Sequence, residues 1–236
     1  MRLSVGNVGV AVRRKAIKHM HLYVEPPEGN VLVSAPHEAT DEEILFFVRE
    51  NFGWVLRERE GMLSQRRQSE RRYVSGETHY IWGEQKFLEV ILQDGWGGIK
   101  ISGNRLLMLA PHESTEKSRG NYMTEWERGL LTDEIRRILP EWERRTGICI
   151  DSFAIQNMRR SWGKCNATKG RIIINLQLVR KDKEALAYVV LHELCHMKYR
   201  THGKEFVAMM SYFMPNWSDV RARLNEAPLD FVSLSR

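Results

Sequence analysis

The segment VVLHELCHMKYRTHGKEF, residues 189–206, contains the side chains from which both fold and chemistry can be inferred. His192, Glu193 and His196 form an H-E-x-x-H pattern, and His202 follows six residues later. The residues before His192 are apolar, which is typical of a helix buried inside a domain. Residues four apart in a helix project from one face, about 40° apart around the axis, so His192 and His196 can bind one cation.

The remaining polar residues of this segment complete a catalytic metal site. Glu193 is offset by about 100° from His192, so it is poorly placed as a ligand but can reach a water at the metal. This is the arrangement of zinc hydrolases, in which two histidines bind and the glutamate acts as general base. A catalytic zinc takes three protein ligands and keeps one open position. We expect His202 to be the third ligand, with Glu205 as the alternative, and the helix to end near residues 199–201. The prediction is one Zn²⁺ per chain, although imidazole also suits other divalent metals.

The hydrophobic patterning predicts an α+β fold. Residues 8–35 and 79–110 are strand-like and contain turn signals, and Thr40 begins an amphipathic helix of about five or six turns. A long helical region follows Ser114, with a break or kink expected at Pro140. Residues 154–179 read as strand, turn and strand, ahead of a helix capped by Asp182. We divide the chain into an N-terminal β-rich region with a long helix (1–115) and a C-terminal domain with a small sheet and an active-site helix (116–236).

Two stretches of the chain are similar to one another. SAPHEATDEE at 34–43 and LAPHESTEKS at 109–118 share Ala-Pro-His-Glu-x-Thr between a strand and a helix. We interpret this as a repeated strand-to-helix junction, in which proline ends the strand and threonine caps the helix, rather than as a duplicated hairpin-plus-helix unit. His37 and His112 are then surface residues and not metal ligands.

The charge and the cysteine content of the chain indicate its cellular location and the kinds of partner that it can bind. The net charge of +6 allows contact with a nucleotide or nucleic acid, but acidic residues are mixed in throughout, so a peptide or protein substrate is favoured. Three cysteines without CxxC spacing indicate a reducing cytoplasm and neither a disulfide framework nor a structural zinc site. We find no signal peptide and no apolar run of the roughly 20 residues that a membrane helix needs, so no membrane partner is expected. Nothing in the sequence indicates an oligomeric state.

The sequence resembles the YgjP-like zinc metallopeptidases, which are allied to SprT-like and other small gluzincin-type domains. The family segment YVVxHELxHxxxxxHxxxF stands here as YVVLHELCHMKYRTHGKEF, preceded by SWGKC (161–165) and INLQLV (174–179). The resemblance implies a zincin-like catalytic domain, with His192, His196 and His202 as ligands and Glu193 as base. The chain departs from the family pattern at Ser161 and Lys164, which replace the usual arginine and serine, so its substrate can differ.

The residues that contact substrate are less well defined than the metal ligands. Arg159, Arg160, Lys164 and Tyr199 are our candidates for stabilising the developing oxyanion. We expect the strand at 171–179 to offer its edge to an extended peptide.

Two alternatives to a peptidase remain. One is a nucleoside-triphosphate pyrophosphatase using the same metal, since basic residues precede the site. The other is a DNA-associated accessory module whose metal is not catalytic.

Overall fold

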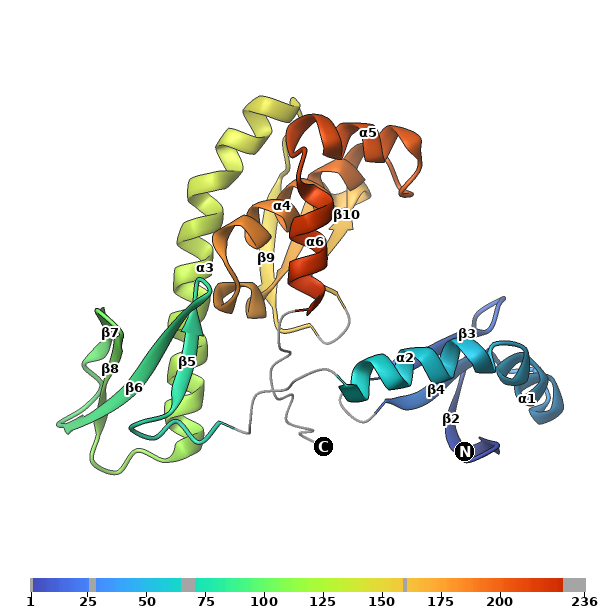
Figure 1. Ribbon diagram of the computed structural model, residues 1–236, viewed down its shortest axis with the longest axis horizontal. Helices are drawn as coiled ribbons and strands as arrows, with labels where there is room; N and C mark the ends of the chain where they lie inside the picture. The colour runs from blue at the N-terminus through green and yellow to red at the C-terminus, as the bar shows by residue number, and fades with distance from the viewer. Residues whose placement is uncertain (1, 26–28, 65–70, 159–160, 227–236) are drawn as a thin grey trace. The chain divides into compact units, whose positions relative to one another are not determined.

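The computed structural model describes residues 2–25, 29–64, 71–158 and 161–226 (Figure 1). These residues form two compact units, one within residues 2–64 and one within residues 71–226. The described part of the chain contains six α-helices and three small sheets, which confirms the predicted α+β class. The domain boundary that we placed between residues 115 and 116 stays a prediction.

The N-terminal unit is a four-stranded sheet covered by two helices. Its strands are ordered β1-β2-β4-β3, with β2 and β4 parallel and the two outer pairs antiparallel. The core lies between β4 and the first helix, where Val33 and Ile44 are fully buried. The elements are β1 (Arg2–Val5), β2 (Val8–Lys15), β3 (His21–Glu25), β4 (Asn30–Pro36), α1 (Asp41–Glu50) and α2 (Phe52–Ser64).

The C-terminal unit begins with a second four-stranded sheet, ordered β5-β6-β8-β7, and a long helix α3 (Glu116–Thr146). Met123 of α3 packs with Leu88, Leu106 and Met108 of this sheet. Farther along, α3 contributes to another core, so one helix serves two clusters (Figure 1). The strands are β5 (Thr78–Ile81), β6 (Glu84–Gln93), β7 (Gly98–Ser102) and β8 (Arg105–Pro111).

These two sheets are copies of one unit. Both have an antiparallel, a parallel and an antiparallel pair in the same order. Pro36 pairs with the last residue of β2, and Pro111 pairs with the last residue of β6. The registers therefore coincide as well as the order. From the shared APHExT sequence we inferred only a repeated strand-to-helix junction, and that interpretation was too narrow. The structure contains the duplicated hairpin-plus-helix unit that we set aside.

The helix of each copy begins in the same way. Thr40 Oγ1 accepts the Glu43 N–H at 3.2 Å, while Glu43 Oε2 accepts the Thr40 N–H at 2.8 Å. Thr115 and Ser118 make the same reciprocal pair at 3.1 and 2.9 Å. Each capping box satisfies two amide groups that would otherwise lack a partner at the helix start. We refer to residues 2–50 as the first repeat and to residues 78–126 as the second repeat.

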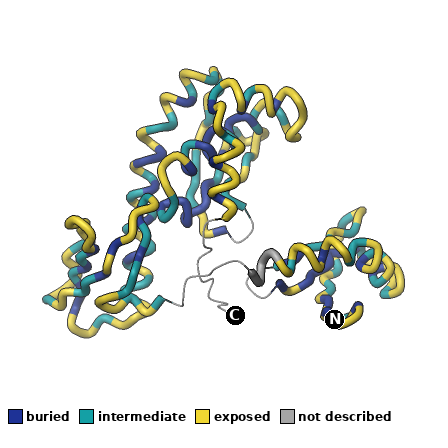
Figure 2. The backbone as a smooth tube through the Cα atoms, viewed as in Figure 1, coloured by how far each residue is buried: buried dark blue, intermediate teal, exposed yellow. Residues whose placement is uncertain are grey.

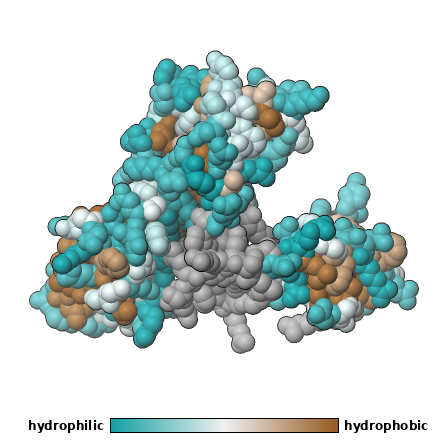
Figure 3. Space-filling model, in the orientation of Figure 1, coloured by the Kyte–Doolittle hydropathy of each residue, from teal (hydrophilic) through white to brown (hydrophobic). Residues whose placement is uncertain are grey.

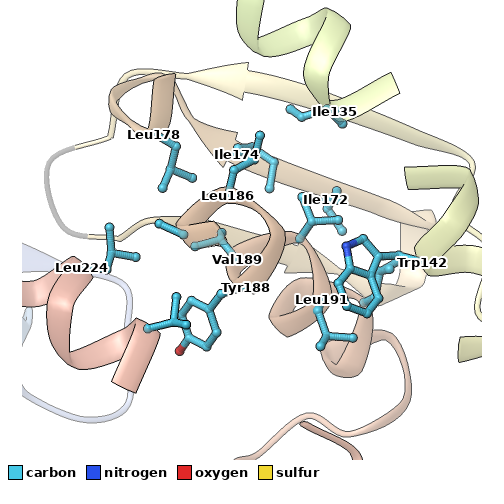
Figure 4. Packing of buried hydrophobic residues seen from close by; sticks show 14 of the residues in the cluster. Ile135, Trp142, Ile172, Ile174, Leu178, Leu186, Tyr188, Val189, Leu191 and Leu224 are labelled. Carbon is cyan, nitrogen blue, oxygen red and sulfur yellow. The ribbon is translucent and has the colours of Figure 1, made fainter. Parts of the chain in front are cut away.

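Helix α4 (Lys183–Lys198), which contains His192 and His196, packs against the third sheet. The strands of this sheet are ordered β10-β11-β9, so β11 lies in the centre and β10 at an edge. Nine of the sixteen residues of α4 are buried, which makes this helix the centre of the core (Figures 2 and 4). Ile172 and Ile174 of β11 pack against it, together with Ile135 and Trp142 of α3. The remaining elements are β9 (Ser152–Gln156), β10 (Gly163–Asn166), β11 (Arg171–Asn175), α5 (Lys204–Phe213) and α6 (Trp217–Glu226).

A buried ion pair joins α3 to the 3₁₀ segment Leu176–Arg180 that follows β11. Arg180 Nε and Nη2 donate to the two carboxylate oxygens of Glu127 at 2.8 and 2.7 Å. The Glu127 side chain is fully buried and that of Arg180 is 13% exposed. A buried carboxylate needs such a partner, because it has lost its hydration.

Two local predictions were wrong, and of the break or kink expected at Pro140 no break occurs. The helix that begins at Thr40 does not continue for five or six turns: it stops at Asn51, whose side-chain amide donates to the Phe47 carbonyl at 2.8 Å, and α2 starts afresh. Helix α3 continues through Pro140 rather than ending there. The strand predicted at 171–179 ends at Asn175, because Asn175 caps a 3₁₀ turn by accepting the Gln177 N–H at 3.2 Å.

Candidate metal centre

Helix α4 contains His192 and His196, two of the predicted ligands, and it ends before His202, the third. Asp182 caps its start by accepting the Ala185 N–H at 2.7 Å. His192 and His196 lie one turn apart in its last half. The helix ends at Lys198, where the Tyr199 N–H donates to the Cys195 carbonyl at 2.9 Å. His202 lies in the short connection to α5, as the sequence required if it was to reach the other two.

The three imidazoles converge on one point. His192 Nε2 is 3.1 Å from His196 Nε2 and 3.2 Å from His202 Nε2. One nitrogen from each ring lies within 4.8 Å of the others. Three ligands in a tetrahedral site with bonds of about 2.0–2.1 Å would be about 3.3–3.4 Å apart, so these nitrogens fit a divalent metal such as zinc. Glu205, the alternative third ligand, is not part of this group within the described residues.

Neighbouring groups hold the imidazoles in the orientation and charge state that a metal requires. His196 Nδ1 lies 2.9 Å from the Tyr199 carbonyl and can donate its proton there, which leaves the lone pair on Nε2. The ring of Phe206 is 4.7–5.0 Å from all three imidazole rings and is itself buried. Burial, followed by the charges of His196, His202 and Arg221, lowers the pKa of His192 to about 3. His192 is therefore neutral at physiological pH.

Glu193 lies beside the triad in an apolar environment. It is 5% exposed, and burial raises its pKa to about 8. Its carboxylate lies against Gly163 of β10, where an added Cβ would be 2.4 Å from Glu193 Oε1. A side chain at this position would therefore displace the carboxylate of Glu193, and glycine leaves room for it. A packing role of Gly163 beneath the site is one of the two roles that the SWGKC segment suggests, but its contact with Glu193 is seen only in the folded structure.

A cleft of about 660 Å³ is lined by His192, Glu193 and His196. Its lining includes residues 163–168, and Lys164 is the predicted substrate residue that it contains. Arg200 also lines the cleft, although we did not single it out, because a lone arginine after a helix gives no signal in the sequence. Tyr199 places its carbonyl on His196, and its ring packs against the core. Arg159 and Arg160 lie outside the described residues.

The strand order of the third sheet changes the strand edge at which we expect a peptide substrate to bind. Strand β11 pairs with a neighbour on both sides, so it has no edge to offer to a peptide. Strand β10 pairs with β11 on one side and, among the described strands, with none on the other. It is β10 that lines the cleft.

Three histidines that could hold a metal ion lie beside a buried glutamate, and two of them belong to a helix packed against a small sheet, which is the arrangement expected of a metal-dependent hydrolase. A comparison with protein families agrees: the model described as YgjP-like, metallopeptidase domain matches residues 18–227. The chain belongs to this YgjP-like family, which confirms the resemblance seen in the sequence, and the family implies a bound metal ion.

Other comparisons add less. A search of curated proteins finds no match. Among solved structures, the chain is similar to the metallopeptidase zymogen abylysin of Pyrococcus abyssi, with 19% identity and a TM-score of 0.36, over 38% of this chain and 90% of that chain.

All three cysteines are free thiols. Within the described residues, no helix combines the length and apolar character needed to cross a bilayer.

Proposed function

We propose that this protein is a zinc-dependent peptidase that hydrolyses peptide bonds with water. The observation that carries the proposal is the convergence of His192, His196 and His202 beside a buried carboxyl group. The three imidazoles would hold the zinc, and Glu193 would exchange protons with the attacking water. When bound, zinc would supply a Lewis acid that polarises the scissile carbonyl and lowers the pKa of water.

The side chains of the protein carry out the proton transfers. Glu193 removes a proton from the water that attacks the carbonyl carbon, and later gives a proton to the departing amine nitrogen. In the metal-free protein burial raises the pKa of this carboxyl group to about 8, and a bound zinc ion would lower that pKa towards neutrality, where the group can both accept and give a proton. Lys164 and Arg200 both line the cleft, so both are candidates to stabilise the negative charge that develops on the oxygen of the scissile carbonyl.

The edge of β10 is the proposed binding surface for the substrate backbone. An extended peptide that pairs with a strand edge gains main-chain hydrogen bonds without regard to its sequence. Gly163 leaves room for the carboxylate of Glu193 beside that edge. The cleft would therefore accept an extended, unfolded segment in preference to a folded surface.

Purified protein reloaded with zinc tests this function when it is assayed against casein-derived peptides and a panel of nucleoside triphosphates. Glu193→Gln is expected to retain zinc by elemental analysis and to lose about 10²–10⁴-fold in kcat on peptides. Glu205→Gln, an exposed glutamate near the triad, serves as the matched control and keeps its activity. Unchanged turnover of the Glu193→Gln protein with zinc bound would remove Glu193 from the reaction. Hydrolysis of nucleotides without hydrolysis of peptides would replace the peptidase by the pyrophosphatase.

A further inference from the structure

A shallow apolar groove lies on the first repeat, between α1 and the loop before β3. Its volume is about 510 Å³, and it is lined by Met20, Phe46 and Phe47 together with three glutamates, Glu42, Glu43 and Glu50. We call it the α1 groove. Phe46 is 65% exposed, which is unusual for a phenylalanine in a folded domain. Hydrophobic surface is visible on this unit in Figure 3.

In the second repeat, an aromatic side chain covers the surface that corresponds to the α1 groove. Counting from the shared APHExT sequence, Phe47 corresponds to Tyr122. Counting back from the paired strands β3 and β7, His19 corresponds to Trp96. The indole of Trp96 lies on the ring of Tyr122, with centroids 4.2 Å apart. The second repeat therefore covers this position with an aromatic side chain of its own, whereas the first repeat has a histidine there and the groove is open.

Some of the other groove positions also differ between the repeats, whereas Glu50 corresponds to Glu125, which is acidic too. Phe46 corresponds to Asn121, and Glu42 corresponds to Lys117. The first repeat thus has a more apolar floor and a more acidic rim than its closed counterpart. Glu43 is held in the capping box, but Glu42 and Glu50 are exposed beside the phenylalanines. These carboxylates stand out on a chain whose net charge is +6.

We propose that the α1 groove is a docking site for a segment of a partner protein in which an aromatic side chain is flanked by lysine or arginine. The aromatic ring would lie on Phe47 as Trp96 lies on Tyr122. The neighbouring cations would face Glu42 and Glu50, and such pairs fix the orientation of a partner more than they add affinity. Buried aromatic anchors beside arginine are the residues that dominate interface energies, so a short segment is sufficient.

The test uses the full chain with Glu193→Gln, so that peptide probes are not cleaved, and measures fluorescence anisotropy. The probe is a short labelled peptide with one tryptophan between lysine and arginine. Two matched peptides replace the tryptophan by alanine or the basic residues by glutamate. We expect saturable binding of the first peptide and at least tenfold weaker binding of the other two.

Variants of the groove decide whether the probe binds there. His19→Trp, Glu42→Lys and Phe46→Asn introduce the residues of the second repeat at the corresponding positions, and each is expected to weaken binding of the tryptophan peptide at least tenfold. Glu58→Lys, which changes an exposed glutamate on α2 outside the groove lining, is the matched control and keeps wild-type affinity. Circular dichroism confirms that each variant is folded.

Three outcomes would overturn the proposal. The first is equal affinity for the three peptides, and the second is unchanged affinity in all the groove variants. The third is self-association in sedimentation experiments that Phe46→Asn abolishes, because the occupant would then be another molecule of this protein.

Discussion

The buried carboxyl group of Glu193 makes the stability of the metal-free protein depend on pH in a predictable direction. Burial raises its pKa from the ordinary value of 4.5 to about 8 in the folded state, whereas the unfolded chain keeps the ordinary value. Below pH 4.5 the group is protonated in both states and no penalty exists. As the pH rises from 4.5 towards 8, the unfolded state ionises first, so the free energy of unfolding falls. Above about 8 both states are ionised and the loss is complete.

The size of this loss follows from the pKa values. Each unit of difference between folded and unfolded states corresponds to 1.36 kcal/mol, so the full effect is about 5 kcal/mol. Between pH 5 and pH 8 the expected change is about 4 kcal/mol. Glutamine resembles the protonated carboxyl group and does not titrate, so Glu193→Gln should lack this component. The stability of the variant relative to the wild type is therefore expected to rise steadily over this range.

Guanidinium unfolding of chelator-treated protein, followed by tryptophan fluorescence at several pH values, measures the effect. Differences between the wild type and Glu193→Gln cancel the contributions of the other titrating groups. Glu205→Gln provides the control, because this side chain is exposed, and it should follow the wild type at every pH. A constant offset between the wild type and Glu193→Gln from pH 5 to 8 would refute the reasoning, since it would mean that the folded state does not suppress ionisation of Glu193.

Replacing His202 by alanine is expected to abolish stoichiometric zinc binding, which elemental analysis measures, whereas Glu205→Gln keeps the metal. Gly163→Ala is expected to lower kcat on peptides at least tenfold with an unchanged circular dichroism spectrum, because the added methyl group would overlap the carboxylate of Glu193, the proposed base. Arg180→Met leaves the buried carboxylate of Glu127 unpaired and is expected to cost about 3–5 kcal/mol in denaturant unfolding. Exchanging both partners, Arg180→Met with Glu127→Leu, should recover most of that loss.

Each of these predictions has a result that would contradict it. Full zinc content in His202→Ala would show that another side chain can complete the site. Wild-type kcat in Gly163→Ala would mean that β10 can move away from α4 without consequence. Similar stability of Arg180→Met and the wild type would show that Glu127 reaches solvent or another partner after the substitution.

Local sequence was sufficient to predict that three histidines converge, because they are close together in the chain. His192 and His196 are one helical turn apart, and His202 is near enough that only the end of α4 had to be inferred. The capping boxes at Thr40 and Thr115 could be read in the same way, since each involves residues three apart.

Features that depend on distant parts of the chain were not predictable from the sequence. Gly163 matters because of Glu193, thirty positions later, and spacing carries no trace of that contact. The central position of β11 depends on pairing with β9 and β10 on both sides. Helix α3 continues through Pro140, although a proline removes one helical hydrogen bond, because residues on both sides of it are packed.

Helix α3 couples two parts of the molecule that would otherwise be separable. Helix α1 of the first repeat ends after ten residues, whereas the corresponding helix α3 has thirty-one. The additional residues of α3 pack against the α4 core. Met123 near one end and Trp142 near the other belong to different clusters but to one continuous helix. The long helix thus links the second sheet to the α4 core, and loosening that sheet is expected to disturb the positions of His192 and His196 as well.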